Sequence, residues 1–585
     1  MDFPAPSPRY KWIALSNTTI AVLLATIDSS IMLIAMPQIF HGIRLNPLEP
    51  HNTLYLLWMI LGYQVVTSVL VVSLGRLGDM FGRVRMYNLG FIVYTVASLA
   101  LTLDPDTGQA GALWLVIGRI VQGIGAAFLV ANSGAILTDA FPADQRGLAL
   151  GINNVAGISG NFLGLVLGGV LAAIHWRLIF LVSVPFGLFG TVWSYLKLRE
   201  IGHRESTPID WGGNITFASG LTLIMIGITC GIQPANGHAM GWSSRLVLSL
   251  LATGVALMVA FAVIEARARA PMFRLPLFRI RAFTFGTLST FLSAIGRGGL
   301  MFMLIIWLQG VWLPLHGYSF EETPLWAGIF MLPLSLGFLI AGPLSGVLSD
   351  RLGARYFATG GMIGAAASLL LLMLLPIDFR YGLFAAILLF SGVSMGAFAA
   401  PNRAAVMNSL PARDRGAGSG MNATFQNSAQ VLSIGIFFSL MIAGLSTTLS
   451  TTLKQGLMRH GVSAAVAAHV ASLPPVSVLF AAFLGYNPLR TLLGPGVLSH
   501  LSAANRAALT GHAFFPELIA PPFHAGLTAA FTFATAACLI AAAASWSRGS
   551  RYVHEERIER TPPGESPPSL PPSAEARPHV ERAAD

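Results

Sequence analysis

Three charged side chains fall inside apolar stretches long enough to cross a membrane: Asp28, Arg119 and Arg297. A charge at the centre of a bilayer costs at least ~2.5 kcal/mol and usually marks function. Asp28 is the only acid well inside such a stretch, so we expect it to bind and release a coupling proton. A neighbouring cation favours the carboxylate, whereas desolvation favours the protonated acid, so a conformational change can shift the balance between them.

The helices that must carry Asp28 and Arg119 place both side chains at the same depth. The first helix, expected over 12–36, runs outward, and Asp28 lies eight residues, or roughly 12 Å, before its outer end. The fourth helix, 111–137, enters from outside, and Arg119 lies eight residues along it. We therefore expect the two to face one cavity, where Arg119 modulates the proton affinity of Asp28. The alternative is a static ion pair that only holds the helices together.

Arg297 takes nearly the same place in the ninth helix, 282–308, that Asp28 takes in the first. It stands among Gly296, Gly298 and Gly299, from where its side chain is not expected to reach the lipid headgroups. We expect it to line the cavity, either as a counter-charge or as a contact for an anionic substrate.

The other candidates for a substrate cavity are amide and aromatic side chains. Asn422, Gln426 and Gln430 are four apart on the helix 420–445 and so form a polar stripe. Such stripes line a substrate site or satisfy one another across helices. Amides with aromatic rings suit an amphipathic organic molecule in a mostly apolar pocket. The further residues assigned to this cavity are Trp58, Tyr63, Gln122, Trp307 and Gln309.

Composition makes the chain an all-α polytopic membrane protein. Of its 585 residues, 54% are hydrophobic and only 10% charged, with a mean hydropathy of +0.68, which excludes an ordinary soluble protein. Fourteen spans are expected at about 20 residues each. They cover 12–36, 54–74, 86–103, 111–137, 148–173, 178–198, 211–231, 246–265, 282–308, 325–347, 356–375, 381–405, 420–445 and 524–546.

The basic residues set the orientation. Most of the 35 Lys and Arg fall in the N-terminus, the loops after even-numbered helices and the C-terminal tail, which predicts both termini in the cytoplasm. The net charge of +10 is scattered singly and forms no aromatic-interleaved patch, so nucleic-acid binding is not expected. Phosphate-loop, H-E-x-x-H and G-x-S-x-G motifs are absent from the sequence, so we expect no enzyme activity, metal or cofactor.

A short Gly- and Arg-containing stretch separates the second and third helices. It contains Gly75, Gly78, Asp79, Gly82 and Arg83, and the sequence predicts a tight loop in which Asp79 caps or pairs with a helix end. Its G-x-L-x-D-x-x-G-R-x-R spacing resembles the signature loop of the major facilitator superfamily of secondary transporters. A degenerate second copy, half a chain later, contributes Gly346, Asp350, Arg351 and Gly353. Both are interpreted as conformational switch loops.

Further motifs resemble the fourteen-helix drug:proton antiporters. The run from Leu24 to Pro37 is similar to that family's first-helix pattern, and Gly118 to Gly125 resembles the R-x-x-Q-G-x-G motif associated with proton transfer. In the fifth helix Leu165 stands where the antiporter motif has a proline that kinks the helix. Four glycines of that helix, Gly157, Gly160, Gly164 and Gly168, recur at intervals of three and four and form one small-residue face, which either packs closely or slides during transport. Gly169 is the last glycine of the same motif.

The resemblance implies two six-helix halves, 1–200 and 282–547, with two inserted helices in 201–281. It implies a monomeric proton-coupled exporter of amphipathic organic compounds, a multidrug efflux protein that alternates access across the cell membrane. Its partners would be protons, a small organic substrate and the lipid bilayer. The alternative is a dedicated exporter of one endogenous metabolite or lipid.

Two regions lie outside the expected bundle. The external connection 446–523 is rich in Pro and is interpreted as a surface lid of short amphipathic helices, with a hidden re-entrant segment as the alternative. The tail 548–585 has almost no apolar residues and is predicted to be disordered.

Overall fold

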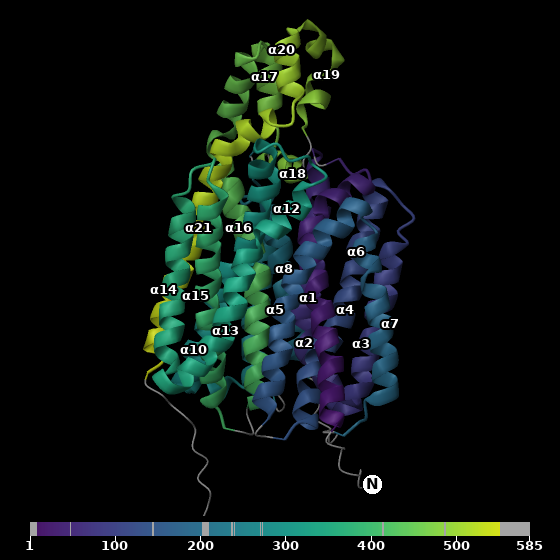
Figure 1. Cartoon of the computed structure of the whole chain (residues 1–585), viewed down its shortest axis with the longest axis vertical. Coiled ribbons are helices and arrows are strands. Elements are labelled where there is room, and N and C mark those ends of the chain that lie inside the picture. Colours follow the sequence, from purple (N-terminus) through teal and green to yellow (C-terminus); the bar gives the residue numbers. More distant parts are fainter. Residues whose placement is uncertain are drawn as a thin grey trace, which may run out of the picture.

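The computed structural model describes residues 9–549 except 47, 143–144, 202–209, 236–237, 239, 269–270, 272, 412–414 and 485–486. Within these residues the chain is helical, without a strand, and fourteen helices are long and apolar enough to cross a membrane. The all-α fold with fourteen spans is therefore confirmed. In Figure 1 these helices stand side by side, and the beginning of α1 and the end of α21 lie at the same end of the bundle. We call this the terminal end and the opposite one the loop end.

The first group of helices forms one side of the bundle (Figure 1). Helix α1 packs against both α4 and α5, and α4 also packs against α2 and α3. The helices are α1 (Tyr10–Gly42), α2 (Pro50–Phe81), α3 (Arg83–Thr102), α4 (Gly108–Ala140), α5 (Arg146–Ile174), α6 (Leu178–Leu181) and α7 (Ser183–Lys197). With Leu165 in place of the proline that would kink it, α5 is one continuous helix of 29 residues.

The second group forms the other side and is less regular. Its members are α10 (Arg281–Trp307), α11 (Leu313–Leu315), α12 (Thr323–Phe330), α13 (Leu332–Leu352), α14 (Ala354–Met373), α15 (Tyr381–Asn408), α16 (Arg415–Arg459) and α21 (Phe514–Ser547). A π-helical turn, η2 (Leu308–Trp312), interrupts the ninth span between α10 and α11. Helix α10 lies against α15, α16 and α21, and α13 lies against α15.

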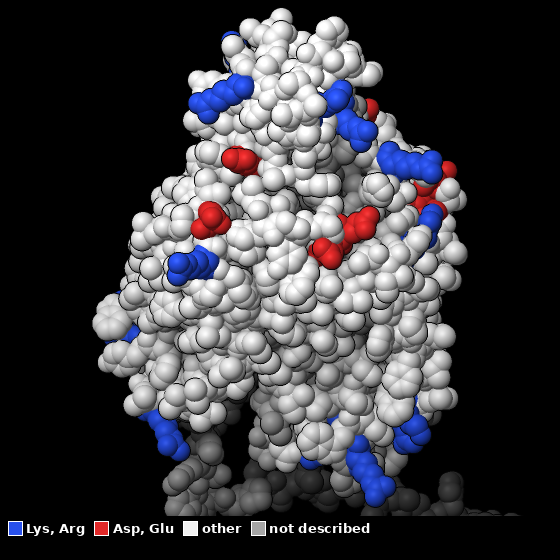
Figure 2. Space-filling view, turned by 45° about the horizontal axis from the view of Figure 1, so that its top comes forward, with Lys and Arg blue, Asp and Glu red and all other residues white. Residues whose placement is uncertain are grey.

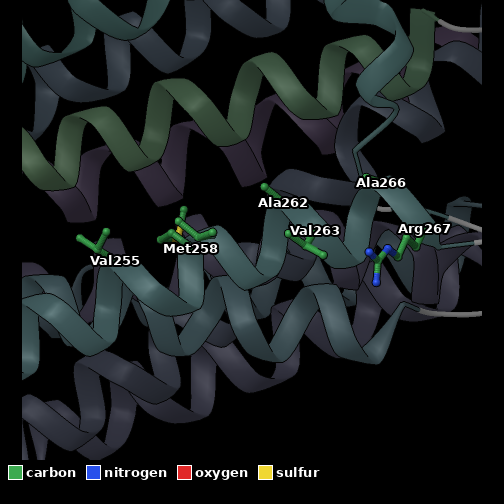
Figure 3. A pocket seen from close by; sticks show the side chains of 7 residues that line it. Val255, Met258, Ala262, Val263, Ala266 and Arg267 are labelled. Carbon is green, nitrogen blue, oxygen red and sulfur yellow. The ribbon is translucent and has the colours of Figure 1, made fainter.

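Helices α8 (Trp211–Ile232) and α9 (Arg245–Arg267) form a hairpin between the two groups, followed by the 3₁₀ turn η1 (Leu275–Arg279). Helix α8 contacts α2 on one side and α16 on the other. Helix α9 packs on α8, and its remaining surface is exposed and apolar. A shallow groove of about 560 Å³ follows this outer face from Val255 to Arg267 (Figure 3). In a membrane this face meets lipid, so the groove is distinct from the interior polar sites described below.

Residues 446–523 differ from the expected lid in one part. Helices α16 and α21 extend beyond the expected spans and carry α17 (Ala464–Ala471), α19 (Leu489–His500) and α20 (Ala503–Thr510) away from the bundle (Figure 1). Helix α18 (Pro475–Phe483) bends back by 85° from α17, and all nine of its residues are buried. The interpretation as a surface helix is therefore wrong for α18. It is apolar on every side and packs against α2, α16, α21 and η2.

The two sides meet toward the loop end. Gly169 of α5 lies against Leu325 of α12, and the carbonyl of Leu165 faces Gly328 of the same helix. At the opposite, terminal end the space-filling view shows a notch between the two lobes (Figure 2). Charged side chains gather toward the two ends of this view and leave a pale belt between them, as a membrane-spanning bundle requires (Figure 2). The conformation is thus closed at the loop end.

Candidate functional site

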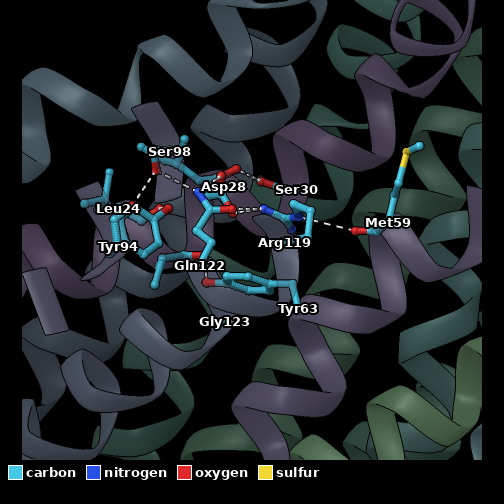
Figure 4. A network of polar contacts seen from close by, with 12 residues as sticks. Leu24, Asp28, Ser30, Met59, Tyr63, Tyr94, Ser98, Arg119, Gln122 and Gly123 are labelled. Atoms are coloured by element: carbon cyan, nitrogen blue, oxygen red, sulfur yellow. Dashed lines mark hydrogen bonds and ion pairs between the residues drawn. The ribbon is translucent and has the colours of Figure 1, made fainter. Parts of the chain in front are cut away.

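Asp28 and Arg119 lie in direct contact at the centre of the first group of helices (Figure 4). Their side chains are 0% and 1% exposed, and an Nη1 proton of Arg119 is donated to Oδ2 of Asp28. Gln122, one turn further along α4, donates from Nε2 to Oδ1 of Asp28 at 3.0 Å and accepts from Arg119 Nη1 at 2.6 Å. Gln122 also donates to Ser98 Oγ of α3 at 2.9 Å. The carboxylate therefore accepts one donor on each oxygen.

The guanidinium of Arg119 is held from its other sides by α2. Its Nε donates to the carbonyl of Met59 at 3.3 Å, and its Cζ lies 4.3 Å from the ring centroid of Tyr63. The Tyr63 hydroxyl donates to the carbonyl of Ala25 on α1 at 3.1 Å. An aromatic face attracts a desolvated cation, so Tyr63 supports the charge of Arg119 without competing for Asp28.

This network has the donors that a buried carboxylate needs, and a buried charge is tolerated only when it is paired and hydrogen-bonded. Protonation of Asp28 would remove the ion pair and leave the Arg119 charge buried without its partner, at a cost of several kcal/mol. In the conformation seen here the network therefore joins α1, α3 and α4 through Asp28, Arg119, Gln122 and Ser98. Separating Asp28 from Arg119 requires a rearrangement of α1 against α4 or entry of water.

Four of the five glycines of α5 pack against α1, within the same group of helices. A Cβ on Gly160 would lie 2.9 Å from the carbonyl oxygen of Leu23, and a Cβ on Gly164 would lie 2.4 Å from that of Ile27. Gly168 likewise approaches the carbonyl of Ile31, and Gly157 meets the side chain of Val22. This face holds α5 close to the helix that carries Asp28. Gly169 instead points across to α12, so it alone of the five is placed at the contact between the two groups.

The first switch-loop sequence is mostly helical rather than a loop. Helix α2 continues through Gly75, Gly78 and Asp79 to Phe81, and α3 begins at Arg83, so only Gly82 breaks the helix, with φ +111°. The expectation of a tight loop over the whole stretch is wrong, because the glycines serve packing instead. A Cβ on Gly78 would lie 1.9 Å from the Oδ1 of Asn132 on α4.

Charges tie this corner together. Arg83 bonds to Asp79 at 2.8 Å and to Asp139, at the end of α4, at 2.6 Å. Glu200 accepts the backbone N–H groups of Arg83 at 2.7 Å and of Val84 at 3.2 Å, which caps the otherwise unsatisfied start of α3. All of these contacts lie within the first group of helices, so Asp79 pairs locally in this conformation.

The second copy of the switch-loop motif has the same helix–glycine–helix backbone as the first copy, but the ion pairs described for Arg83 have no counterpart among its described residues. Helix α13 ends at Leu352, Gly353 breaks the chain with φ +94°, and α14 begins at Ala354. Gly346 lies in α13 near Ala400, and Arg351 is exposed. The backbone of Asp350 is helical, and its side chain lies outside the described residues.

The residues assigned to a substrate cavity separate into three groups. Tyr63 and Gln122 belong to the Asp28 network. Trp307 is 1% exposed and packs edge-on against Phe379 and Phe384. Gln309, in η2, is buried and donates to the carbonyl of Ile34 on α1 at 3.2 Å. These two therefore do not line an open cavity in this conformation, and Gln309 instead joins the two groups of helices. The third group comprises the remaining residues of the predicted cavity. Of these, Asn422 is buried, and the partly exposed ones are Trp58, Arg297, Gln426 and Gln430.

Sequence reasoning missed Ser98, Asp139 and Glu200. A serine in an apolar helix and acids at helix ends or in a loop carry no motif, so no signal in one sequence marks them as partners. The bridging role of Gln122 had a signal, because it lies one turn from Arg119 and therefore on the same face of α4.

Comparison with known proteins decides the family. Residues 18–434 match the sequence model of the Major Facilitator Superfamily. The chain belongs to this superfamily. It is therefore a multi-pass membrane transporter rather than an enzyme, and the resemblance found in its motifs is confirmed.

Individual relatives of this superfamily member are distant but cover most of its length. The riboflavin transporter RibZ of Clostridioides difficile (strain 630) is 28% identical over 440 residues, which cover 75% of this chain and 90% of the relative. A tetracenomycin C resistance and export protein of Streptomyces glaucescens is 25% identical over 540 residues, which cover 91% of this chain and 90% of the relative.

Among solved structures, a bacterial homologue of the human lysosomal transporter Spinster, in an inward-facing and unoccupied conformation, has a TM-score of 0.52 and 15% identity. It covers 94% of this chain and 100% of that one. This likeness supports the fold.

Proposed function

We propose that this transporter exports amphipathic organic compounds in exchange for protons, by alternating access between its two groups of helices. The observation that carries the proposal is the Asp28–Arg119–Gln122 network, which is buried beside the α1–α5 contact and holds the one acid placed well inside the membrane. The tetracenomycin C relative, an export protein by name, supports the direction of transport.

In this proposal the terminal end is the cytoplasmic end, in line with the basic loops, and the protein works as a monomer in the cell membrane. Asp28 takes up a proton while the site is open to the outside. The loop end then closes through α5, α12 and η2. Asp28 meets Arg119 again and releases its proton toward the cytoplasm, where substrate binds for the outward step. The structure corresponds to the stage with the loop end closed and Asp28 paired.

The switch residues Gly82, Asp79 and Arg83 are proposed to set the balance between the two conformations. Their ion pairs hold the ends of α2, α3 and α4 as one unit, which can then move as a rigid body. The matching break at Gly353 lets α13 and α14 move likewise.

The test is efflux from inverted vesicles under an imposed pH gradient, with a panel of lipophilic cations, neutral compounds and anionic dyes. Wild type is expected to move several compounds, and Asp28→Asn, which is matched in shape but cannot ionise, none. Gradient-driven transport by Asp28→Asn at the wild-type rate would refute the role of Asp28.

A second candidate is a dedicated exporter of one endogenous metabolite or lipid. The relative named for riboflavin favours it, since that name indicates one substrate. The same panel separates the two, because a dedicated exporter would leave the whole panel untouched while it transports a component of a cell extract.

A further inference from the structure

Arg297 is a cation in the membrane interior, and among the described residues it has no counter-ion. It lies sixteen residues after the start of α10, or roughly 24 Å at 1.5 Å per residue, which is near the middle of the span. Its guanidinium Cζ is 5.8 Å from the ring centroid of Phe338 on α13. Among the described residues the structure gives it neither a hydrogen bond nor an ion pair, and the side chain is only partly buried.

The helices around Arg297 offer no acid near it. Neither α10 nor its neighbours α15 and α16 contain an Asp or Glu. The acid on α13 is Asp350, twelve residues or roughly 18 Å along the helix from Phe338. Glu517 lies in the first turn of α21, at the loop end. The remaining charges on these elements are basic, namely Arg281, Arg351, Arg403, Arg415, Lys454 and Arg459.

Among the described residues, the acid well inside the membrane is Asp28, and it is already engaged. Both of its oxygens accept from α4, one from Arg119 and the other from Gln122. Within the described membrane interior, Asp28 and Arg119 cancel, and Arg297 leaves one uncompensated positive charge. A charge that is buried without a partner is costly, and its persistence indicates a partner that arrives from solution.

Two neutral hydrogen-bonding side chains lie on α16, the helix that packs against the residue following Arg297. Gly298, the next residue, lets α16 approach so closely that an added Cβ would lie 3.1 Å from Cγ of Gln430. Gln426 stands one turn earlier on α16, and both amides are partly exposed. Neither makes a hydrogen bond among the described residues. The amide N–H groups and the guanidinium together provide donors without a competing carboxylate, and Phe338 adds an aromatic surface.

We propose that Arg297, with Gln426 and Gln430, binds the anionic group of the transported molecule, so that the substrates are amphipathic organic anions such as aromatic carboxylates rather than lipophilic cations. This rests on the proposed transport function and narrows it. Substrate binding at Arg297 neutralises the interior charge, while the proton on Asp28 is handled by a separate network on the other group of helices. A carboxylate and a guanidinium pair through two parallel hydrogen bonds, which Lys cannot reproduce.

The test uses two xanthene dyes of similar shape and opposite charge, fluorescein as the anion and rhodamine 123 as the cation. Binding to detergent-solubilised protein is followed by fluorescence polarisation, and efflux is followed from proteoliposomes. Wild type is expected to bind and export fluorescein and to prefer it over rhodamine 123. Loss of a charge-assisted contact weakens binding by on the order of 10- to 100-fold, so Arg297→Gln should reduce fluorescein affinity by that factor and leave rhodamine 123 affinity unchanged or raised. Arg297→Lys should recover part of the loss.

Stability distinguishes this role from a structural one. A structural arginine would destabilise the protein when replaced, whereas removal of an unpaired interior charge should leave the melting temperature of ligand-free Arg297→Gln equal to or above that of wild type. Arg245→Gln, an exposed arginine of α9, serves as the matched control. It should change neither dye affinity nor stability.

Preference of wild type for rhodamine 123, or fluorescein affinity that is the same in Arg297→Gln, would overturn the proposal while leaving proton-coupled export intact. Conversely, Arg297-dependent fluorescein binding with export that ignores both the pH gradient and Asp28→Asn would sustain the anion site and refute the proton coupling.

Discussion

Replacing Gly169 by Ala should open the loop end. An added Cβ would lie 2.4 Å from Cα of Leu325 on α12, across the contact between the two groups of helices. Carbon atoms prefer about 3.5–4.0 Å, so the two backbones must separate by roughly 1 Å or more. Overpacking of this kind costs about 1–3 kcal/mol, and here the cost falls only on the closed state. The closed-to-open ratio should therefore fall by roughly 5- to 150-fold.

The assay is a distance measurement between two spin labels by double electron–electron resonance. The labels replace Ile174, at the end of α5, and Glu321, just before α12, both of which are exposed at the loop end. The background is Cys230→Ser with Cys538→Ala, which removes the native thiols. Gly169→Ala should shift the distribution toward longer distances.

Two control variants separate this effect from general disturbance of α5. Gly151→Ala adds the same atom to the same helix, where nothing lies within 4 Å, and should leave the distribution unchanged. Gly164→Ala places the Cβ 2.4 Å from the Ile27 carbonyl, within one group of helices, and should lower stability without opening the loop end. A distribution for Gly169→Ala that matches Gly151→Ala would refute the reasoning.

Three further outcomes follow from the contacts. Both Gly82→Ala and Gly353→Ala force a side chain into positive φ, which costs about 1–2 kcal/mol. At Gly82 the Cβ would also clash with the Glu200 carboxylate at 2.7 Å, whereas at Gly353 the nearest atom is Tyr356 Cδ2 at 4.0 Å, an ordinary contact. Gly82→Ala should therefore lower the melting temperature more, and an equal loss would contradict this. Tyr63→Phe removes one hydrogen bond worth about 1 kcal/mol yet keeps the ring under Arg119, so dye efflux should survive, whereas Tyr63→Leu should impair it. Glu200→Ala removes the cap of α3 and should lower the free energy of unfolding by about 1 kcal/mol, whereas Glu200→Gln, whose amide oxygen can still accept a hydrogen bond, should lose less. Equal stability of wild type and both variants would refute the capping role.

Hydropathy and helix length were enough to predict the fourteen spans, because a bilayer imposes one length on every crossing helix. The same counting set Asp28 and Arg119 at one depth, and the structure shows them in contact. Their partners were harder to foresee. Ser98 meets Gln122 only through the packing of α3 on α4, which no local pattern encodes.

The region beyond the membrane shows where local reasoning fails. Residues 446–523 were interpreted as a surface lid, but eight of the nine residues of α18 are apolar, which indicates burial, and α18 is buried against both groups of helices. Which face of α5 meets α1 and which meets α12 likewise depends on long-range packing. Gly157, Gly160, Gly164 and Gly168 were identified as one face from their spacing, and all four lie against α1, but the spacing did not indicate that the neighbouring Gly169 lies against α12.

The most direct test of the central claim is whether Asp28 carries the proton. Purified protein is reconstituted with a pH-sensitive dye in the vesicle lumen, and a gradient of a transported compound is imposed without any pH gradient. The account predicts that in wild type protons move opposite to the compound, so the lumen becomes more acidic when the compound leaves it and more alkaline when the compound enters. Asp28→Asn, although folded and able to bind the compound, should move no protons. Proton movement at the wild-type rate in Asp28→Asn would contradict it.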